Sequence, residues 1–172
     1  MSKLVVAEIE DAAGGNPYSI TISAEQATTS LAARDFTSIP AGVKEIKILL
    51  AGVSTSGTSA LMVQLGDADG IETSGYLGTG YTSNTSNLAV TTGLAMMAST
   101  VAAQNHLGMM IISLEDSSNN TWVSSSVTGS TNDDIGHGGS SKSLSGVLTQ
   151  VRLTTVGGSD TFDAGAAAIQ YQ

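Results

Sequence analysis

The last stretch of the chain, residues 146–172, constrains the fold more than any other part of the sequence. Val151 and Leu153 alternate with polar residues, and Ile169 and Tyr171 repeat this pattern near the end. Strict alternation is typical of a β-strand with one face in a core and the other in water. The stretch therefore predicts two strands joined by a turn, and we expect them to form an antiparallel hairpin that closes the fold.

The connection between these strands runs from Gly157 to Gly165 and is rich in residues that favour turns. It also carries Asp160, Phe162 and Asp163, which could be mistaken for part of an acidic site. We expect Phe162 to plug one end of the core, and the two aspartates to hold the backbone of an ordered loop.

Similar alternation recurs along the rest of the chain. We expect strands at residues 4–9, 18–22, 43–53, 61–65, 106–114 and 122–127, with one or two short strands in 88–97. Residues 54–59 are predicted to be a hairpin loop, 71–87 an irregular loop and 129–145 a long polar loop, whereas 23–33 fits either a helical turn or a loop with a short strand. Many short strands separated by glycine, serine and asparagine turns predict an all-β fold, an antiparallel β-sandwich or jelly roll.

The expected organisation is one main domain with a short N-terminal arm. A chain of 172 residues is most simply a single domain. We assign residues 1–24 to the arm or to first strands, and residues 25–172 to the β-sandwich domain.

Charge and composition exclude several classes of function. The net charge is −9 and there are only six basic residues, which argues against binding to nucleic acid or to anionic membranes. The absence of cysteine excludes thiol catalysis and cysteine-based zinc sites. No signal peptide and no membrane-spanning segment are expected from the sequence.

Two acidic stretches are candidate binding or catalytic sites. Asp67, Asp69 and Glu72 surround a glycine and could hold calcium, but acidic residues are also common at hairpin turns. His137 follows Asp133 and Asp134 in a glycine-rich stretch, which could be a metal site, an oxyanion element or simply a loop. No G-x-S-x-G nucleophile motif accompanies it, and the only other histidine is His106.

Paired carboxylates could in principle hydrolyse glycosidic bonds. The candidates all lie beside turn residues, and nothing marks one of them as an acid held in an apolar pocket; they are Asp67, Asp69, Glu72, Glu115, Asp116, Asp160 and Asp163. The sequence contains neither a phosphate-binding loop nor a dinucleotide glycine motif. We therefore predict no catalytic residue, no cofactor and no metal.

The stretch from Thr73 to Leu114 contains no Asp, Glu, Lys or Arg. Interface cores are depleted of charge and enriched in methionine and aromatic residues. This stretch fits that description, or else it is core with polar loops between its strands. The predicted subunit-interface residues are Tyr76, Tyr81, Met96, Met97, Met109 and Met110.

Four segments together resemble a β-rich module of tailed-bacteriophage virion proteins. They are D-F-T-S-I-P-A-G-V-K-E-I (35–46), G-V-S-T-S-G-T-S (52–59), Q-L-G-D-A-D-G-I-E-T-S-G-Y (64–76) and L-S-G-V-L-T-Q-V-R-L-T-T-V-G-G-S-D-T-F-D-A-G (144–165). The resemblance covers residues 31–172 and extends to tail-fibre-like and capsid decoration proteins. Residues 4–9 loosely resemble the start of some phage fibre proteins.

This resemblance implies a virion component without enzymatic activity, assembled in the cytoplasm of a bacterial host. Fibre proteins usually carry a long shaft or coiled coil, and this chain has no heptad run. The resemblance therefore favours a capsid decoration (cement) protein, self-associated as a homotrimer and bound to the major capsid protein. The alternative is the tip of a tail fibre or head fibre that binds a receptor or glycan on the host surface, for which Trp122, Tyr76 and Tyr81 are the available aromatic residues.

Overall fold

A computed structural model describes residues 19–83, 85 and 87–172. In this part of the chain every regular element is a β-strand and every pairing is antiparallel, so the prediction of an all-β antiparallel fold is confirmed. The strands are β1 (Thr21–Ile22), β2 (Gln26–Ala27), β3 (Ala33–Phe36), β4 (Glu45–Thr55), β5 (Leu61–Asp67), β6 (Gly70–Ile71), β7 (Leu77–Thr82), β8 (Leu88–Val90), β9 (Leu94–Ala95), β10 (His106–Asp116), β11 (Thr121–Ser130), β12 (Ile135–Ser143), β13 (Gln150–Thr155) and β14 (Phe162–Tyr171).

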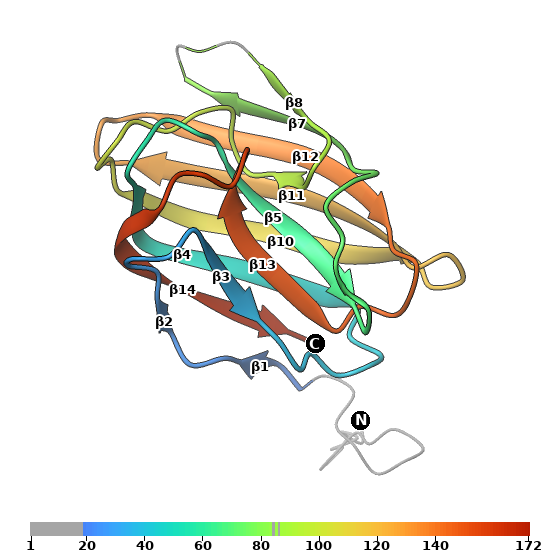
Figure 1. Ribbon diagram of the computed structural model, residues 1–172. Helices are drawn as coiled ribbons and strands as arrows, with labels where there is room; N and C mark the ends of the chain where they lie inside the picture. Colours follow the sequence, from blue (N-terminus) through green and yellow to red (C-terminus); the bar gives the residue numbers. More distant parts are fainter. Residues whose placement is uncertain (1–18, 84, 86) are drawn as a thin grey trace, which may run out of the picture.

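The strands form two open sheets, which lie one against the other in Figure 1. Sheet A has the order β1-β14-β4-β10-β11-β12-β7-β8, with β2 also paired to β14. Sheet B is smaller and has the order β3-β13-β5-β6, with β9 also paired to β5. This arrangement is consistent with a β-sandwich, since the facing sides of the two sheets share one hydrophobic core.

The core is built from the alternating positions of both sheets. Ile46 and Ile48 of β4 and Met110 and Ile112 of β10 are fully buried on the sheet A side. Sheet B contributes one face of β5 and β13, including Leu153. Because β-strand side chains alternate between the two faces of a sheet, the residues between these positions point away from the core.

The two closing strands are present, but they do not form the expected hairpin. β13 pairs with β3 and β5 in sheet B, whereas β14 pairs with β4, β1 and β2 in sheet A. The connection between them therefore crosses from one sheet to the other. Phe162 lies at the end of this crossing and is completely buried, as expected of a plug.

The expected hairpin loop at residues 54–59 is also a crossing between the sheets, because β4 belongs to sheet A and β5 to sheet B. The two crossings are bonded to each other. The backbone N–H of Ser56 donates to the carbonyl of Thr161 at 2.8 Å, and the N–H of Ser59 donates to the carboxylate of Asp160 at 2.9 Å. Asp160 thus holds backbone as predicted, although the backbone belongs to the neighbouring crossing.

Several segments expected to be loops contain strands. Residues 129–145 include β12, and residues 71–87 include β7, so both predictions of continuous loops were wrong. Residues 88–97 contain the two short strands β8 and β9, as predicted. Residues 23–33 contain β2 and no helix, which decides between the two alternatives for that segment.

The part of the predicted arm that the structure describes is attached to the main sheet. Thr21 and Ile22 form β1, which pairs with Tyr171 and Gln170 at one edge of sheet A. The predicted strand at residues 4–9 and the rest of the arm up to residue 18 lie outside the described residues.

Candidate functional site

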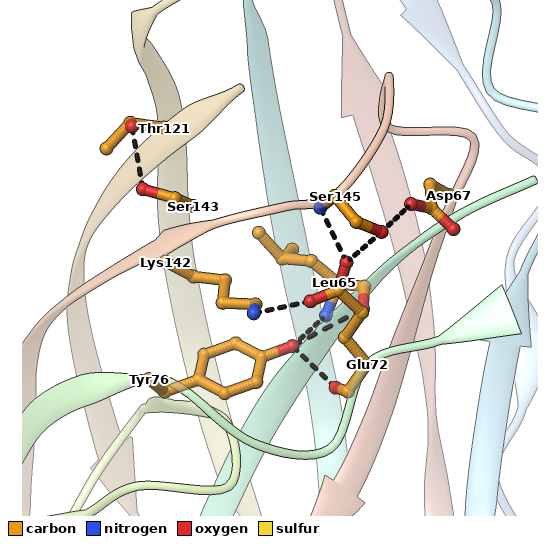
Figure 2. Close-up of polar contacts among 8 residues, drawn as sticks. All are labelled: Leu65, Asp67, Glu72, Tyr76, Thr121, Lys142, Ser143 and Ser145. Carbon is orange, nitrogen blue, oxygen red and sulfur yellow. Dashed lines mark hydrogen bonds and ion pairs between the residues drawn. The ribbon is translucent and has the colours of Figure 1, made fainter. Parts of the chain in front are cut away.

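A buried polar cluster lies where the β5–β6 hairpin meets the end of β12 (Figure 2). Asp67 is 3 % exposed and accepts hydrogen bonds from the backbone N–H of Asp69 at 2.9 Å and from the hydroxyl of Ser145 at 2.7 Å. These bonds, that from Ser145 above all, hold the pKa of Asp67 below its usual value. The carboxylate therefore stays charged and fixes the turn that follows β5.

Glu72 occupies the other side of the same cluster. Its carboxylate accepts from the backbone N–H and hydroxyl of Ser145, at 2.8 and 3.0 Å, and forms an ion pair with Lys142. Burial disfavours its charged form, but the bonds from Lys142 and Ser145 outweigh burial, so the pKa of Glu72 also lies below its usual value. Glu72 thereby ties the segment after β6 to the end of β12.

Tyr76 completes the cluster from the interior of the molecule. Its hydroxyl accepts from the backbone N–H of Leu65 at 2.8 Å and donates to the carbonyl oxygen of Glu72 at 2.8 Å. The ring is 1 % exposed and lies 5.3 Å from the ammonium group of Lys142. Burial raises the pKa of Tyr76, so the phenol stays protonated as a donor.

This cluster has the properties of a brace. Asp67 and Glu72 are engaged by donors from Ser145 and Lys142, and their pKa values are lowered, whereas a general acid needs a raised one. Asp69 is exposed and contributes only its backbone N–H. Within the described residues, no group of three or more potential ligands could hold a metal ion.

The structure separates the histidine stretch into two environments. His137 lies on β12 and packs against the ring of Tyr81, with 4.8 Å between ring centroids. Asp134 accepts instead from the side-chain amide of Gln104 at 2.9 Å. His106 is buried at the start of β10. Neither histidine forms a hydrogen bond with a carboxylate or a hydroxyl group in the described part of the chain, so no triad is assembled there.

The remaining acidic candidates are dispersed over turns and strand ends. Asp116 accepts from the side-chain amide of Asn119 at 2.6 Å and from the backbone N–H of Ser118 at 2.7 Å, and these turn bonds lower its pKa. Asp163 accepts from the hydroxyl of Ser54, and Glu115 is exposed. These carboxylates do not converge on the Asp67 cluster.

The six predicted interface residues fall into two groups. Tyr76, Met96, Met97 and Met110 are at most 1 % exposed and belong to the core of the chain itself. They cannot contact a partner in this conformation, because the two sheets enclose them. Tyr81 is half-buried on β7, and Met109 is 42 % exposed on β10. Only these last two reach the surface.

Exposed apolar residues do gather on one surface, the outer face of sheet A. This face is the side of β10, β11, β12 and β7 that points away from sheet B. Its most exposed members, besides Met109, are Leu77, Leu107, Val123, Val127 and Ile135, which were not predicted. Alternation could have identified them, since Met109 precedes the buried Met110 and Val127 follows the buried Ser126.

A hollow lies on the outer side of sheet B. It has a volume of about 500 Å³, and its lining includes Gln64, Thr92, Arg152 and Thr154. Arg152 is held there by a bidentate pair with Asp35, at 2.6 and 2.8 Å, which lowers the pKa of Asp35 and raises that of Arg152. The aromatic residues considered for sugar binding are elsewhere, and Trp122 and Tyr76 are buried.

Comparison with known proteins finds no matching family model, no matching curated protein and no matching solved structure. No helix in the described residues is long and apolar enough to cross a membrane.

Proposed function

We propose that this chain is a non-enzymatic structural protein of a tailed-bacteriophage particle, and that it decorates the outside of the capsid as a cement protein. The observation that carries the proposal is the contrast between two features. The best-bonded carboxylates, the buried Asp67 and the half-buried Glu72, brace the fold, whereas the broad outer face of sheet A offers exposed apolar side chains. A protein that binds other proteins needs such a face and needs no reactive cleft.

The phage assignment itself rests on the sequence resemblance over residues 31–172. In this proposal the protein assembles in the bacterial cytoplasm and ends in the virion as a homotrimer. The arm attaches it to the major capsid protein or to another virion protein. No cofactor, nucleic acid or membrane insertion is part of the role.

The fold in this proposal is a variant of the jelly roll. Two features support it: connections such as β4–β5, β12–β13 and β13–β14 pass from one sheet to the other, and both sheets are antiparallel. The β10–β11–β12 meander within sheet A is a departure from the simplest form of that topology.

The alternative function is that of a tail-fibre or head-fibre tip that binds a host receptor or glycan. The observation that favours it is the hollow beside Arg152, whose lining of threonine hydroxyls and the Gln64 amide suits a polyhydroxylated ligand. A glycan array separates the two functions, because specific glycan binding is expected only of a fibre tip.

Deletion of residues 1–18 tests the decoration role. The deletion stops short of β1 and leaves the described sheets intact, so the truncated chain should fold with an unchanged circular dichroism spectrum. We expect it to fail to join particles, while the full chain should be visible on the capsid surface by electron microscopy. Normal incorporation of the truncated chain, or its location on the tail, would refute the proposed arrangement.

A further inference from the structure

We propose that the outer face of sheet A is the surface through which copies of this chain associate, each packing its apolar residues against the same face of a neighbouring copy. A contact between the same face of two copies is self-complementary and pairs them about a twofold axis, so the oligomer expected here is a dimer and not the homotrimer of the proposed function. The inference rests on the proposed function only in that a decoration protein acts as an oligomer. It assigns the contact to particular residues, which the function alone does not do.

Apolar side chains and aromatic rings form a continuous row across the sheet. Met109 of β10 pairs with Val127 of β11, which pairs with His137 of β12, which pairs in turn with Tyr81 of β7. All four lie on the outer face, because residues at paired positions of neighbouring strands point to the same side. Val127 is 64 % exposed, although it lies in the middle of the widest part of the sheet.

A shallow hollow beside this row makes the outer face uneven. Its volume is about 370 Å³, and it is lined by residues of β10 and β11, among them Met109, Ile111, Ser125 and Val127. Ridges and hollows of similar size allow two such faces to interdigitate, as the inner faces of a β-sandwich do.

The charge distribution favours a second copy as the occupant. The chain carries a net charge of −9, so copies repel each other wherever their acidic surfaces meet. The outward positions of β11, β12 and β7 carry no Asp, Glu, Lys or Arg, and the two acidic residues of β10, Glu115 and Asp116, lie at the end of that strand remote from Met109. On neighbouring β4 the charges of Glu45 and Lys47 are paired, with 3.3 Å between their charged groups. Uncharged faces can meet without this repulsion, whereas a strongly basic partner would find no counter-charge here.

The size of the face is close to that of a standard interface. Four strands spaced about 4.8 Å apart, each about nine residues long, cover about 20 by 30 Å, or about 600 Å² of projected area. Adding β4 brings this area to about 750 Å², and a stable interface of standard size needs about 800 Å² from each partner.

The edges of sheet A are poorly suited to the same task. The edge strands are β1, with two residues, and β8, with three. Such short edges offer few backbone groups for pairing with another chain, and this is a common way in which proteins avoid edge-to-edge association. We therefore expect copies of the chain to associate through the outer face of sheet A and not through its edges.

Val127→Lys tests the assignment, with Val147→Lys as the matched control. Both valines are more than half exposed, at 64 % and 54 %, so lysine should leave the fold intact at either position, as thermal melting would verify. Val147 lies in the segment between β12 and β13, away from the outer face of sheet A. An unpaired charge buried in the contact should weaken association of Val127→Lys by about a hundredfold or more. Val147→Lys should associate like the parent chain.

Light scattering across the micromolar range measures the association of the full chain. A parent chain that is monomeric throughout, or a Val127→Lys variant that associates as the parent does, would overturn the inference. A monomeric parent whose 1–18 deletion associates would show that the arm covers the face instead, and would overturn it too. A folded oligomer that is sensitive to Val127→Lys but absent from particles would refute the proposed function and support this inference.

Covalent capture gives a second, independent measurement. The chain has no cysteine, so Val127→Cys and Val147→Cys each introduce a single thiol. A short bis-maleimide linker should join copies of Val127→Cys much faster than copies of Val147→Cys at the same concentration. Equal rates for the two variants would contradict a contact centred on Val127.

Discussion

The packing of the segment 94–98 against the inner face of sheet A yields a sharp prediction about glycine. Leu94, Met96 and Met97 are almost completely buried there. The segment lies so close to the inner face of β12 that a Cβ atom on Gly138 would overlap the carbonyl oxygen of Ala95. We therefore expect Gly138→Ala to displace the segment, because the obstructing atom belongs to the backbone and cannot rotate away.

The expected loss of unfolding free energy follows from the packing and the hydrogen bonds that the displacement of segment 94–98 disturbs. Overpacking of a tightly packed interior costs about 1–3 kcal/mol. Two hydrogen bonds anchor the segment, from the hydroxyl of Ser126 to the carbonyl of Met96 and from the N–H of Ala95 to the hydroxyl of Ser140, each at 2.8 Å. Weakening one of them adds about 1 kcal/mol. A total of about 3 kcal/mol lowers the melting temperature of a protein of this size by about 10 °C.

Gly139→Ala is the matched control, one residue further along the same strand. A Cβ atom there points outward, and its nearest neighbour is the carbonyl oxygen of Ser124 at 4.0 Å. Because alanine has less conformational freedom to lose than glycine, this variant should melt at the same temperature as the parent or slightly higher. Calorimetry on the three chains measures both effects. Equal melting temperatures for the two variants would refute the close approach of segment 94–98 to β12.

Two further predictions concern buried charge. Lys142→Met leaves the carboxylate of Glu72 without its cation and should lower the unfolding free energy, measured in urea, by about 2 kcal/mol. Adding Glu72→Gln to this variant should recover most of the loss. Equal losses in the single and double variants would contradict a coupled pair. Burial lowers the pKa of His106 and outweighs the opposing influence of Asp134, so the native state favours the neutral imidazole. The contribution of His106 to stability is therefore complete above its unfolded pKa of about 6.5, and it is lost as the pH falls below that value. The unfolding free energy of His106→Gln should fall less than that of the parent between pH 7 and pH 5. The same pH dependence of the unfolding free energy in both chains would contradict a lowered pKa of His106 in the native state.

Alternation predicted strands well wherever one face of a strand is buried. β4 and β10 were identified because Ile46 and Ile48, and likewise Met110 and Ile112, recur at every second position. Alternation says which face of a strand is buried and nothing about which strand lies beside it. That is why the sequence pattern predicted a hairpin of β13 and β14, although in the structure each strand pairs with strands far away in the sequence.

β12 was not predicted as a strand because its composition resembles that of a loop. Its sequence, I-G-H-G-G-S-S-K-S, combines glycine and serine with few apolar residues. Small residues are required on its inner face because Ala95 and Met97 pack directly against Gly138 and Gly136. The reason for the composition is therefore a contact with a distant segment, which local patterns do not reveal.

The candidate surface was only partly predictable for a related reason. The absence of charge in residues 73–114 does not distinguish a core from an interface, since both exclude charge. Met109 and Met110 show the difference: they are neighbours in sequence, yet one is 42 % exposed and the other fully buried. The strand register separates them, and the same reasoning applied to β11 would have identified Val127.

The position of β14 has a consequence for the order in which the protein can be made. β14 is the last of the described strands in chain order, yet it lies inside sheet A, between β4 on one side and β1 and β2 on the other (Figure 1). A ribosome delivers β1 to β13 first, so during synthesis β4 has an unpaired edge along its whole length. That edge is closed only when residues 162–171 emerge, and a nascent chain is therefore open to pairing with its neighbours until β14 is inserted.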